Sequence, residues 1–176
     1  MERAVLVVSG IPGVGKTTIA SLIARRLPRS AHIEAEVLMR FVVGGAVRPG
    51  DRPDDETSRQ LRLRGRQVAL LADSFLDAGF TPVIDDVVIG SRLDELRADL
   101  HSRPLLFVLL VPRLEVIRAR NQGRPGKDVF EAWKHLAAVA REETPRVGLW
   151  LDTSDQTPEE SAREIRHRAW TEGRVP

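Results

Sequence analysis

Short apolar runs alternate with amphipathic segments along this chain. The apolar runs predict β-strands at about residues 4–9, 31–35, 81–88, 104–111 and 148–152. Between them, apolar residues recur at three- or four-residue spacing and predict helices at about residues 16–27, 54–78, 91–100, 113–122, 128–140 and 157–170. Alternating strands and helices are typical of an α/β fold with a parallel sheet. The continuous apolar run at 104–111 suits a central strand that is covered on both faces.

Turn and capping residues mark where several of these elements begin and end. Gly79 is expected to stop the long second helix, because glycine readily takes the backbone conformation that ends a helix. Thr157 and Glu160 form a capping-box pattern at the start of the last helix, with Pro158 at its first position. The residues after Thr171 are expected to fray.

The first predicted strand leads into a loop and a helix start with the sequence Gly10, Ile11, Pro12, Gly13, Val14, Gly15, Lys16, Thr17 and Thr18. The pattern G-x-x-x-x-G-K-[ST] between a strand and a helix is typical of a phosphate-binding loop. Its glycines let the backbone approach a polyphosphate, and the helix N-terminus adds partial positive charge. We therefore expect residues 10–18 to bind ATP, with Lys16 at the β- and γ-phosphates, Thr17 on Mg²⁺ and Thr18 at the α-phosphate.

Carboxylates follow the second and third predicted strands. Ligands of parallel sheets bind at the carboxyl ends of the strands, so these side chains are candidates for chemistry. Asp85 and Asp86 are neighbours in a strand and point in opposite directions, so only one should face the phosphates. We expect Asp86 to serve Mg²⁺, with Asp85 as the alternative. Glu36 is expected to accept the proton of an acceptor hydroxyl, with Glu34 as the alternative.

An arginine-rich segment follows the fourth predicted strand. Glycine and proline at positions 123, 125 and 126 favour a hinge. We expect a lid at about residues 113–127, in which Arg118 contacts the nucleotide while Arg120 and Arg124 stabilise the transferred phosphoryl group. A solvated basic helix is the alternative interpretation.

The long helix at 54–78 carries polar and apolar residues on its outward face. Arg59, Arg62 and Arg66 lie opposite the apolar stripe, where a solvated face is the simplest interpretation and contact with an acceptor or phosphate is the alternative. Leu63 and Leu70 share that outward face and make a lid contact or a dimer contact conceivable.

Composition narrows the possible classes. A chain of 176 residues suggests a single domain, residues 1–176, with one core. The net charge is only +2 and no basic–aromatic patch is present, so no nucleic-acid partner is expected. The chain contains no cysteine, which excludes disulfides, thiolate metal sites and cysteine nucleophiles, and its four histidines match no metal-binding spacing. With every apolar run far below membrane-spanning length, we expect a cytoplasmic protein, monomeric or homodimeric.

Taken together, these residues resemble the small P-loop kinases: chloramphenicol phosphotransferase-like proteins, adenylylsulfate and gluconate kinases, zeta toxins and polynucleotide kinases. The resemblance is specific at residues 10–18. The stretch Val83-Ile84-Asp85-Asp86-Val87-Val88 looks most like the chloramphenicol phosphotransferase branch. The resemblance implies a three-layer P-loop fold with a five-stranded parallel sheet in the order 2-3-1-4-5, and an adenine-contacting loop at Thr153 and Ser154. The family's acidic base is usually aspartate, and Glu36 best matches its place here.

We therefore expect an ATP-dependent phosphotransferase that moves the γ-phosphate to a hydroxyl of a small antibiotic-, sugar- or metabolite-like molecule. A nucleoside or nucleotide kinase shares every nucleotide-side feature and differs only in its acceptor pocket. A nucleotide-dependent ATPase switch or binding protein would have no acceptor at all. Acceptor-dependent turnover distinguishes the kinases from the switch, and the absence of an N-K-x-D sequence argues against a GTPase.

Overall fold

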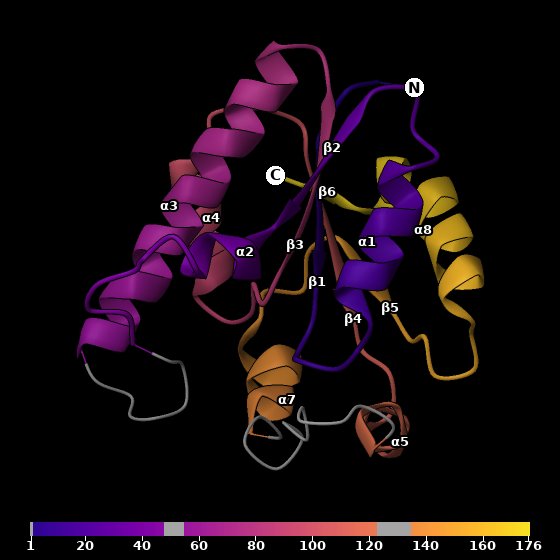
Figure 1. Ribbon diagram of the computed structural model, residues 1–176. Helices are drawn as coiled ribbons and strands as arrows, with labels where there is room; N and C mark the ends of the chain where they lie inside the picture. The colour runs from indigo at the N-terminus through magenta and orange to yellow at the C-terminus, as the bar shows by residue number, and fades with distance from the viewer. Residues whose placement is uncertain (1, 48–54, 123–134) are drawn as a thin grey trace.

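The computed structural model describes residues 2–47, 55–122 and 135–176, which form an α/β fold around a central sheet. Its parallel strands are β1 (Val5–Ser9), β2 (Ser30–Glu34), β3 (Thr81–Asp86), β4 (Leu105–Leu110) and β5 (Leu149–Leu151). They lie in the order β2-β3-β1-β4-β5 (Figure 1), which confirms the expected order. Each pairing along this path is parallel.

A sixth strand corrects the expectation of a purely parallel, five-stranded sheet. β5 pairs only with the second half of β4, which leaves the first half of that edge free. The chain end fills it: β6 (Arg174–Val175) runs antiparallel to β4, and the Phe107 backbone N–H donates to the Gly173 carbonyl at 2.7 Å. The prediction that residues after Thr171 fray is therefore wrong, because these residues satisfy backbone groups of a buried strand.

Helices cover both faces of the sheet. Helices α1 (Lys16–Ala24) and α8 (Pro158–Glu172) lie on one side, and α3 (Asp55–Asp77) and α4 (Arg92–Asp99) lie on the other (Figure 1). The short helix α2 (Ala35–Met39) directly follows β2. Helix α5 (Leu114–Gln122) follows β4, and α7 (Leu136–Ala138) continues into a π-helical turn, η1 (Val139–Glu143), before β5.

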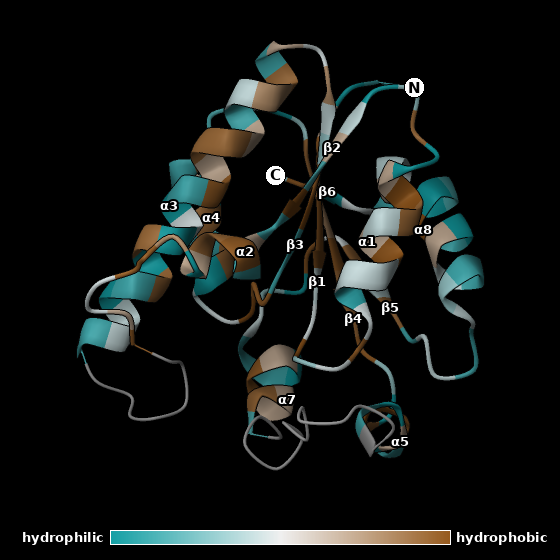
Figure 2. Cartoon of the chain, viewed as in Figure 1, coloured by the Kyte–Doolittle hydropathy of each residue, from teal (hydrophilic) through white to brown (hydrophobic). Residues whose placement is uncertain are grey.

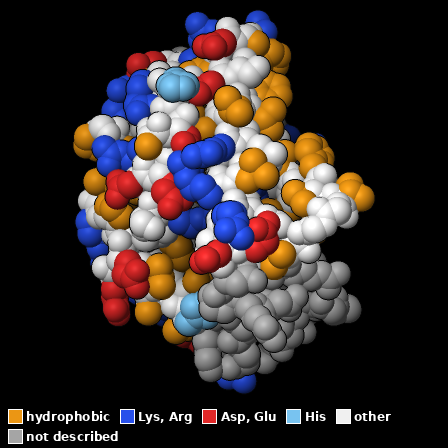
Figure 3. Space-filling view, turned by 90° about the vertical axis from the view of Figure 1, so that its left-hand side faces the viewer, with side chains coloured by type: hydrophobic (Ala, Val, Ile, Leu, Met, Phe, Trp, Pro, Cys, Tyr) orange, Lys and Arg blue, Asp and Glu red, His pale blue; other side chains and the backbone are white. Residues whose placement is uncertain are grey.

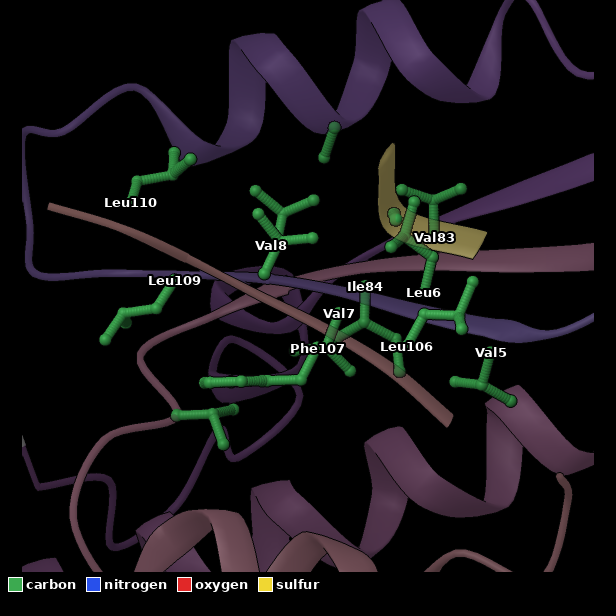
Figure 4. Close-up of a cluster of buried hydrophobic side chains, with 14 of the residues drawn as sticks. Val5, Leu6, Val7, Val8, Val83, Ile84, Leu106, Phe107, Leu109 and Leu110 are labelled. Carbon is green, nitrogen blue, oxygen red and sulfur yellow. The ribbon is translucent and has the colours of Figure 1, made fainter. Parts of the chain in front are cut away.

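The core lies on the three middle strands. Every residue of β1, β3 and β4 is buried. Figure 4 shows their apolar side chains packed above and below the sheet, with Phe107 among them. Figure 2 shows the same arrangement as hydrophobic strands inside helices with hydrophilic outer faces. The doubly covered strand predicted at 104–111 is confirmed as β4, since Leu105–Leu110 are all buried.

Capping residues mark the end of α3 and the start of α8 as predicted. Gly79 follows α3 with φ +84°, which is the left-handed conformation that glycine adopts easily. Thr157 and Glu160 form the predicted capping box of α8: the Thr157 hydroxyl accepts from the Glu160 N–H, and the Glu160 carboxylate accepts from the Thr157 N–H. Helix α1 ends at Ala24, three residues before the predicted end at Leu27.

The outer face of α3 is only partly a solvated stripe. Arg59 is exposed and pairs with Glu56 of its own helix, as a surface residue does. Arg62 instead turns towards α4 and forms a bidentate ion pair with Asp99. Leu63 and Leu70 are exposed as predicted. Figure 3 shows this side of the molecule, where basic, acidic and hydrophobic side chains are interspersed.

The ends of β1 and β3 are tied together next to the first loop. The Ser9 hydroxyl donates to the Val88 carbonyl at 2.7 Å and accepts from the Val88 N–H at 3.0 Å. This double contact fixes the segment after β3 beside the start of the glycine-rich loop. Among the described residues, no helix is both long and apolar enough to span a bilayer.

Candidate active site

The glycine-rich loop joins β1 to α1, and the core anchors it. Ile11 and Val14 are buried in the hydrophobic core and so anchor the loop, whereas Thr17 and Thr18 are exposed on the first turn of α1. Gly15 caps the helix with φ +99°, a conformation that is unfavourable for residues with a side chain. The loop and the N-terminus of α1 thus line one open space, as a phosphate site requires.

Gly13 is required by contact as well as by conformation. Its φ is +91°, and a methyl group added there would lie 2.4 Å from the Asn121 amide nitrogen. Asn121, on α5, is 2% exposed, and its Nδ2 has no hydrogen-bond partner within the described part of the chain. The helix after β4 therefore packs directly against the bare backbone of the loop.

Lys16 sits at the centre of the site in an unfavourable environment. Its ammonium donates to the Ile11 carbonyl at 3.1 Å. The pKa of Lys16 is lowered from its usual 10.5 to about 8. Burial is the main cause and Arg64 adds to it, while Asp85, Asp86 and Glu36 oppose the shift. The ammonium is thus poorly compensated in the free protein, and the oxygens of a bound polyphosphate would compensate it.

Asp85 faces the phosphate-binding loop. The Thr17 hydroxyl donates to Asp85 Oδ1 at 3.0 Å. On its other side, Asp85 Oδ2 lies 2.7 Å from His32 Nε2, which comes from the neighbouring strand β2. These two contacts orient the Asp85 carboxylate next to the hydroxyl that is expected to bind Mg²⁺.

Asp86 points elsewhere and forms a buried ion pair. Its Oδ1 accepts from Arg64 Nη2 at 2.6 Å and from the Val87 N–H at 2.7 Å. The two side chains are 8% and 10% exposed. The preference for Asp86 as the Mg²⁺ carboxylate therefore does not fit the geometry. The alternative, Asp85, is the residue that Thr17 contacts.

The two candidate bases both follow β2. Glu34 is the last residue of that strand and precedes α2, and Glu36 lies in the first turn of α2. Glu34 is half-buried and Glu36 is exposed. Both line the same cavity as the phosphate-binding loop, so the structure leaves the two alternatives open.

One cavity of about 1310 Å³ joins these groups. Its phosphate side is formed by the loop, with Lys16, Thr17 and Asp85. Its other side is formed by α2, α3, α4 and the π-helical turn. Three arginines from α3 and α4 line that second side: Arg62, Arg64 and Arg92.

Sequence reasoning missed Arg64 and Arg92. Arg64 is 8% exposed and lies among the buried residues of α3, at helical spacing from Gln60 and Val68. An arginine on the inward face of an amphipathic helix was the available signal, since such residues are seldom buried unless paired. Arg92, at the first position of α4, carried no comparable signal. His32 was considered only as a metal ligand, yet its Nε2 lies 2.7 Å from Asp85 Oδ2.

The residues expected in the lid and in the adenine loop are not brought together at the cavity. Arg118 is exposed on α5. Arg120 donates to the carbonyls of Thr153 at 2.8 Å and of Val14 at 3.3 Å, so it ties the loop after β5 to the phosphate-binding loop. Arg124 and the predicted lid beyond residue 122 lie outside the described residues.

Thr153 and Ser154 lie after β5, where the resemblance placed the adenine loop. Neither is among the described residues that line the cavity. Thr153 is buried, and its hydroxyl has no hydrogen-bond partner among the residues that the structure describes. The Ser154 hydroxyl accepts from the Arg113 N–H at 2.8 Å. Their role in contacting adenine stays a prediction.

Comparisons with known proteins agree with this architecture. The chain is similar over 94% of its length to 94% of a sugar kinase from Janibacter sp. HTCC2649, with 24% identity and a TM-score of 0.69. A tunicamycin resistance protein of Deinococcus radiodurans matches with 20% identity and a TM-score of 0.64, each chain being covered to 99%. The Mycobacterium tuberculosis APS kinase, solved with AMPPNP and APS, matches with 18% identity and a TM-score of 0.65, over 95% of this chain and 98% of that one.

At these identities the solved structures establish a shared fold. No curated protein matches the sequence. The profile of the family described as chloramphenicol phosphotransferase-like protein matches residues 3–170 and so spans nearly the whole chain. The matched region includes the phosphate-binding loop, Asp85, Asp86 and α3. The chain therefore belongs to the chloramphenicol phosphotransferase-like family.

Proposed function

We propose that this protein transfers the γ-phosphoryl group of ATP to a hydroxyl group of a small molecule. The observation that carries the proposal is that the phosphate-binding loop, Asp85 and Glu36 line one cavity. That cavity is large enough for an acceptor beside the terminal phosphate of a nucleotide. Family membership supports the same reaction class. Because ATP is a cytoplasmic metabolite, the proposal assigns the protein to the cytoplasm.

The loop residues 10–18 would hold the triphosphate. Six of them line the cavity at the N-terminus of α1, where anions are stabilised. Lys16 would exchange its contact with the Ile11 carbonyl for the β- and γ-phosphates. The negative charge there would restore the pKa of Lys16 towards its usual value, so the ammonium is a better partner for nucleotide than for the empty loop.

The residues that would hold Mg²⁺ are Thr17 and Asp85. Among the described residues there is no cluster of three acidic, histidine or cysteine side chains that could cage a metal. One hydroxyl and one carboxylate fit Mg²⁺, which usually binds through one or two carboxylates together with substrate phosphates. When bound, the ion would neutralise charge on the β- and γ-phosphates. His32 would keep the Asp85 carboxylate in place through its 2.7 Å contact.

Glu36 is the proposed general base. The acceptor oxygen forms a bond to the γ-phosphorus while the bond from that phosphorus to the β,γ-bridging oxygen breaks and ADP leaves. The hydroxyl proton passes to the Glu36 carboxylate. Glu36 is close enough to Lys16 to oppose the lowering of the lysine's pKa, so it lies on the side of the cavity where the γ-phosphate is expected.

The test is coupled ADP release with MgATP and a panel of acceptors: chloramphenicol-like and aminoglycoside antibiotics, sugars, hydroxy acids, nucleosides and adenylylsulfate. Lys16→Ala is the control for the nucleotide site. Stimulation by one acceptor class that is lost in Lys16→Ala would establish the transferase. MgATP binding without stimulation by any acceptor would instead favour a switch, and absence of nucleotide binding would overturn the proposal.

A matched pair of variants tests the base. Glu36→Gln should lower acceptor-dependent turnover by about 10²- to 10⁴-fold, the usual contribution of a general base. The apparent KM for MgATP should change little, because the residue does not hold the nucleotide. Glu34→Gln is the matched control on the same segment. If Glu34→Gln shows the large loss and Glu36→Gln stays active, the assignment moves to Glu34.

A further inference from the structure

The arginines on the acceptor side of the cavity differ in how well their donors are satisfied. Arg62 forms two hydrogen bonds with Asp99, one of them at 2.8 Å, and lies 3.8 Å from Glu95. Its hydrogen-bonding capacity is largely used in joining α3 to α4. It therefore serves as a structural contact at the rim.

Only some of the hydrogen-bond donors of Arg64 have an acceptor among the described residues. Its Nη2 donates to Asp86 at 2.6 Å, but its Nε–H is buried without a partner within the described residues. A buried donor without an acceptor destabilises the fold, so native structures seldom keep one without a reason. Arg64 is among the residues that line the cavity, although its Nε atom itself has almost no accessible surface.

The Arg92 guanidinium forms no hydrogen bond or ion pair with the described residues, although it is half-buried in the cavity wall. Burial lowers its pKa, and the positive charge of Arg64 lowers it further. The nearby carboxylates of Asp86 and Glu95 act in the opposite direction. Asp86 is already bonded to Arg64, and the Glu95 side chain is 42% exposed at the rim. Arg92 thus lines the cavity with N–H donors that have no acceptor among the described residues.

We propose that the acceptor is a hydroxy acid whose carboxylate is bound by Arg64 and Arg92 in this cavity. A guanidinium offers only donors, and a carboxylate offers only acceptors in a matching planar geometry. The inference rests on the proposed transferase function and specifies its substrate class.

The neighbouring charges favour a carboxylate over a phosphate group. Asp86 pairs with Arg64, and Arg92 has no ion-pair partner among the described residues, which leaves about one positive charge to be balanced inside the wall. A monoanion matches that excess, whereas a dianionic phosphate would bring surplus charge close to Asp86. Met39, Val47 and Leu61 also line the cavity and provide apolar contacts for a carbon skeleton.

The positions of Arg64 and Arg92 relative to Lys16 separate the proposed carboxylate subsite from the nucleotide site. Arg64 lies near enough to Lys16 to lower its pKa, so an acceptor held by the arginines would lie beside the γ-phosphate. Arg92 belongs to α4, and no residue of the phosphate-binding loop bonds to its side chain among the described residues. A change at Arg92 should therefore affect the acceptor and spare the nucleotide.

The test compares acceptors that share one carbon chain: glycerate, glycerol and glycerol 3-phosphate, and likewise gluconate, glucitol and glucitol 6-phosphate. Coupled ADP release gives kcat and KM for each, and thermal shift in the presence of the MgATP analogue MgAMPPNP gives binding. The variant is Arg92→Gln. Its matched control is Arg97→Gln on the same helix, where Arg97 bonds to Asp94 and the Pro176 carbonyl outside the cavity.

We expect the wild type to prefer a hydroxy acid to its neutral polyol. Arg92→Gln should raise the KM for the acid by about 10- to 100-fold, the range for losing a charge-assisted contact, and leave kcat within about threefold. The KM for MgATP and the rate with neutral polyols should not change, and Arg97→Gln should behave as wild type. Since the Arg92 side chain loses no bonded partner, the melting temperature of Arg92→Gln should not fall.

Several outcomes would overturn the carboxylate subsite. They are preference for a neutral polyol or for the phosphate ester, retained acid preference in Arg92→Gln, and absence of any carboxylate-dependent thermal shift in the wild type. Stimulation by neutral acceptors alone would refute this inference while leaving the transferase intact. Loss of MgATP binding, or turnover that survives in Lys16→Ala, would refute the transferase itself.

Discussion

The low pKa of Lys16 predicts an unusual pH dependence of stability. In the unfolded chain Lys16 keeps its proton up to a pKa of about 10.5, but in the folded protein it releases it at about 8. Between these values the unfolded state binds more protons than the folded state. The free energy of unfolding therefore rises with pH across this window, and the penalty for burying the ammonium is fully present below pH 8.

The size of the effect follows from the same two values. At 1.36 kcal/mol per pH unit, the difference between 10.5 and about 8 corresponds to a ceiling of about 3 kcal/mol. The side chain is half-buried, so water screens part of this penalty and about 1–2 kcal/mol is the expected value. In Lys16→Met, loss of the hydrogen bond to the Ile11 carbonyl offsets roughly 1 kcal/mol of the gain.

The composition makes the measurement clean. The chain has no cysteine or tyrosine, and its only other lysines are Lys127 and Lys134, which wild type and variant share. Urea unfolding of both proteins, followed by tryptophan fluorescence at pH 7, 8, 9 and 10, gives two stability curves. Their difference reports Lys16 alone.

We expect Lys16→Met to be as stable as the wild type or slightly more stable at pH 7, and the wild type to gain on it by about 1–2 kcal/mol between pH 8 and 10. MgATP should stabilise the wild type and not the variant. Parallel curves would refute the low pKa. So would a variant that is less stable by more than about 1 kcal/mol at pH 7, because the lysine would then stabilise the empty loop.

Three further sets of substitutions test the surrounding contacts. Asp85→Asn should raise the Mg²⁺ concentration needed for turnover about tenfold or more with little loss of stability, whereas Asp86→Asn should cost about 3 kcal/mol in urea unfolding because it breaks a buried ion pair. The reverse pattern would return the metal role to Asp86. Gly13→Ala should destabilise the protein by roughly 1–3 kcal/mol, and adding Asn121→Ala should restore only the stability lost through the clash, since the strain of φ +91° remains. Full recovery of stability in thermal melts would show that the backbone is not strained. Arg120→Met should lower stability by about 1–3 kcal/mol through lost hydrogen bonds to carbonyl groups, and it should raise the KM for MgATP more than it lowers kcat. A selective fall in kcat would instead place Arg120 at the transferred phosphoryl group.

The parts of this structure that are set by local sequence could be predicted from it. The phosphate-binding loop follows from nine consecutive residues, because glycine conformation and the start of α1 depend on neighbours in the chain. The order of the strands came from the resemblance and is confirmed. The helix that Thr157 and Glu160 cap was predictable for the same reason, since a capping box lies within one turn.

Contacts between distant segments could not be predicted in this way. Alternation along β3 shows that Asp85 and Asp86 point apart, but not which of them meets the loop. That choice depends on His32 in β2 and on Arg64 in α3, which are 53 and 22 residues away from their respective partners. β6 was missed for a similar reason: two residues carry no periodic signal, and they pair only because β5 is too short to cover β4.

The paired aspartates divide the cavity into two electrostatic halves. Asp85 belongs to the phosphate half, where Thr17 and His32 hold it. Asp86 lies in the half where we propose that the acceptor binds, and it holds Arg64 in place through a buried ion pair. Such a pair adds little net stability, because desolvating two charges costs about as much as their attraction gains. Its value is positional: it fixes a guanidinium beside the phosphate site while leaving donors for a ligand. Under the proposed function, two adjacent carboxylates in one strand serve two substrates, because the alternation of the strand sends them to opposite halves of one cavity.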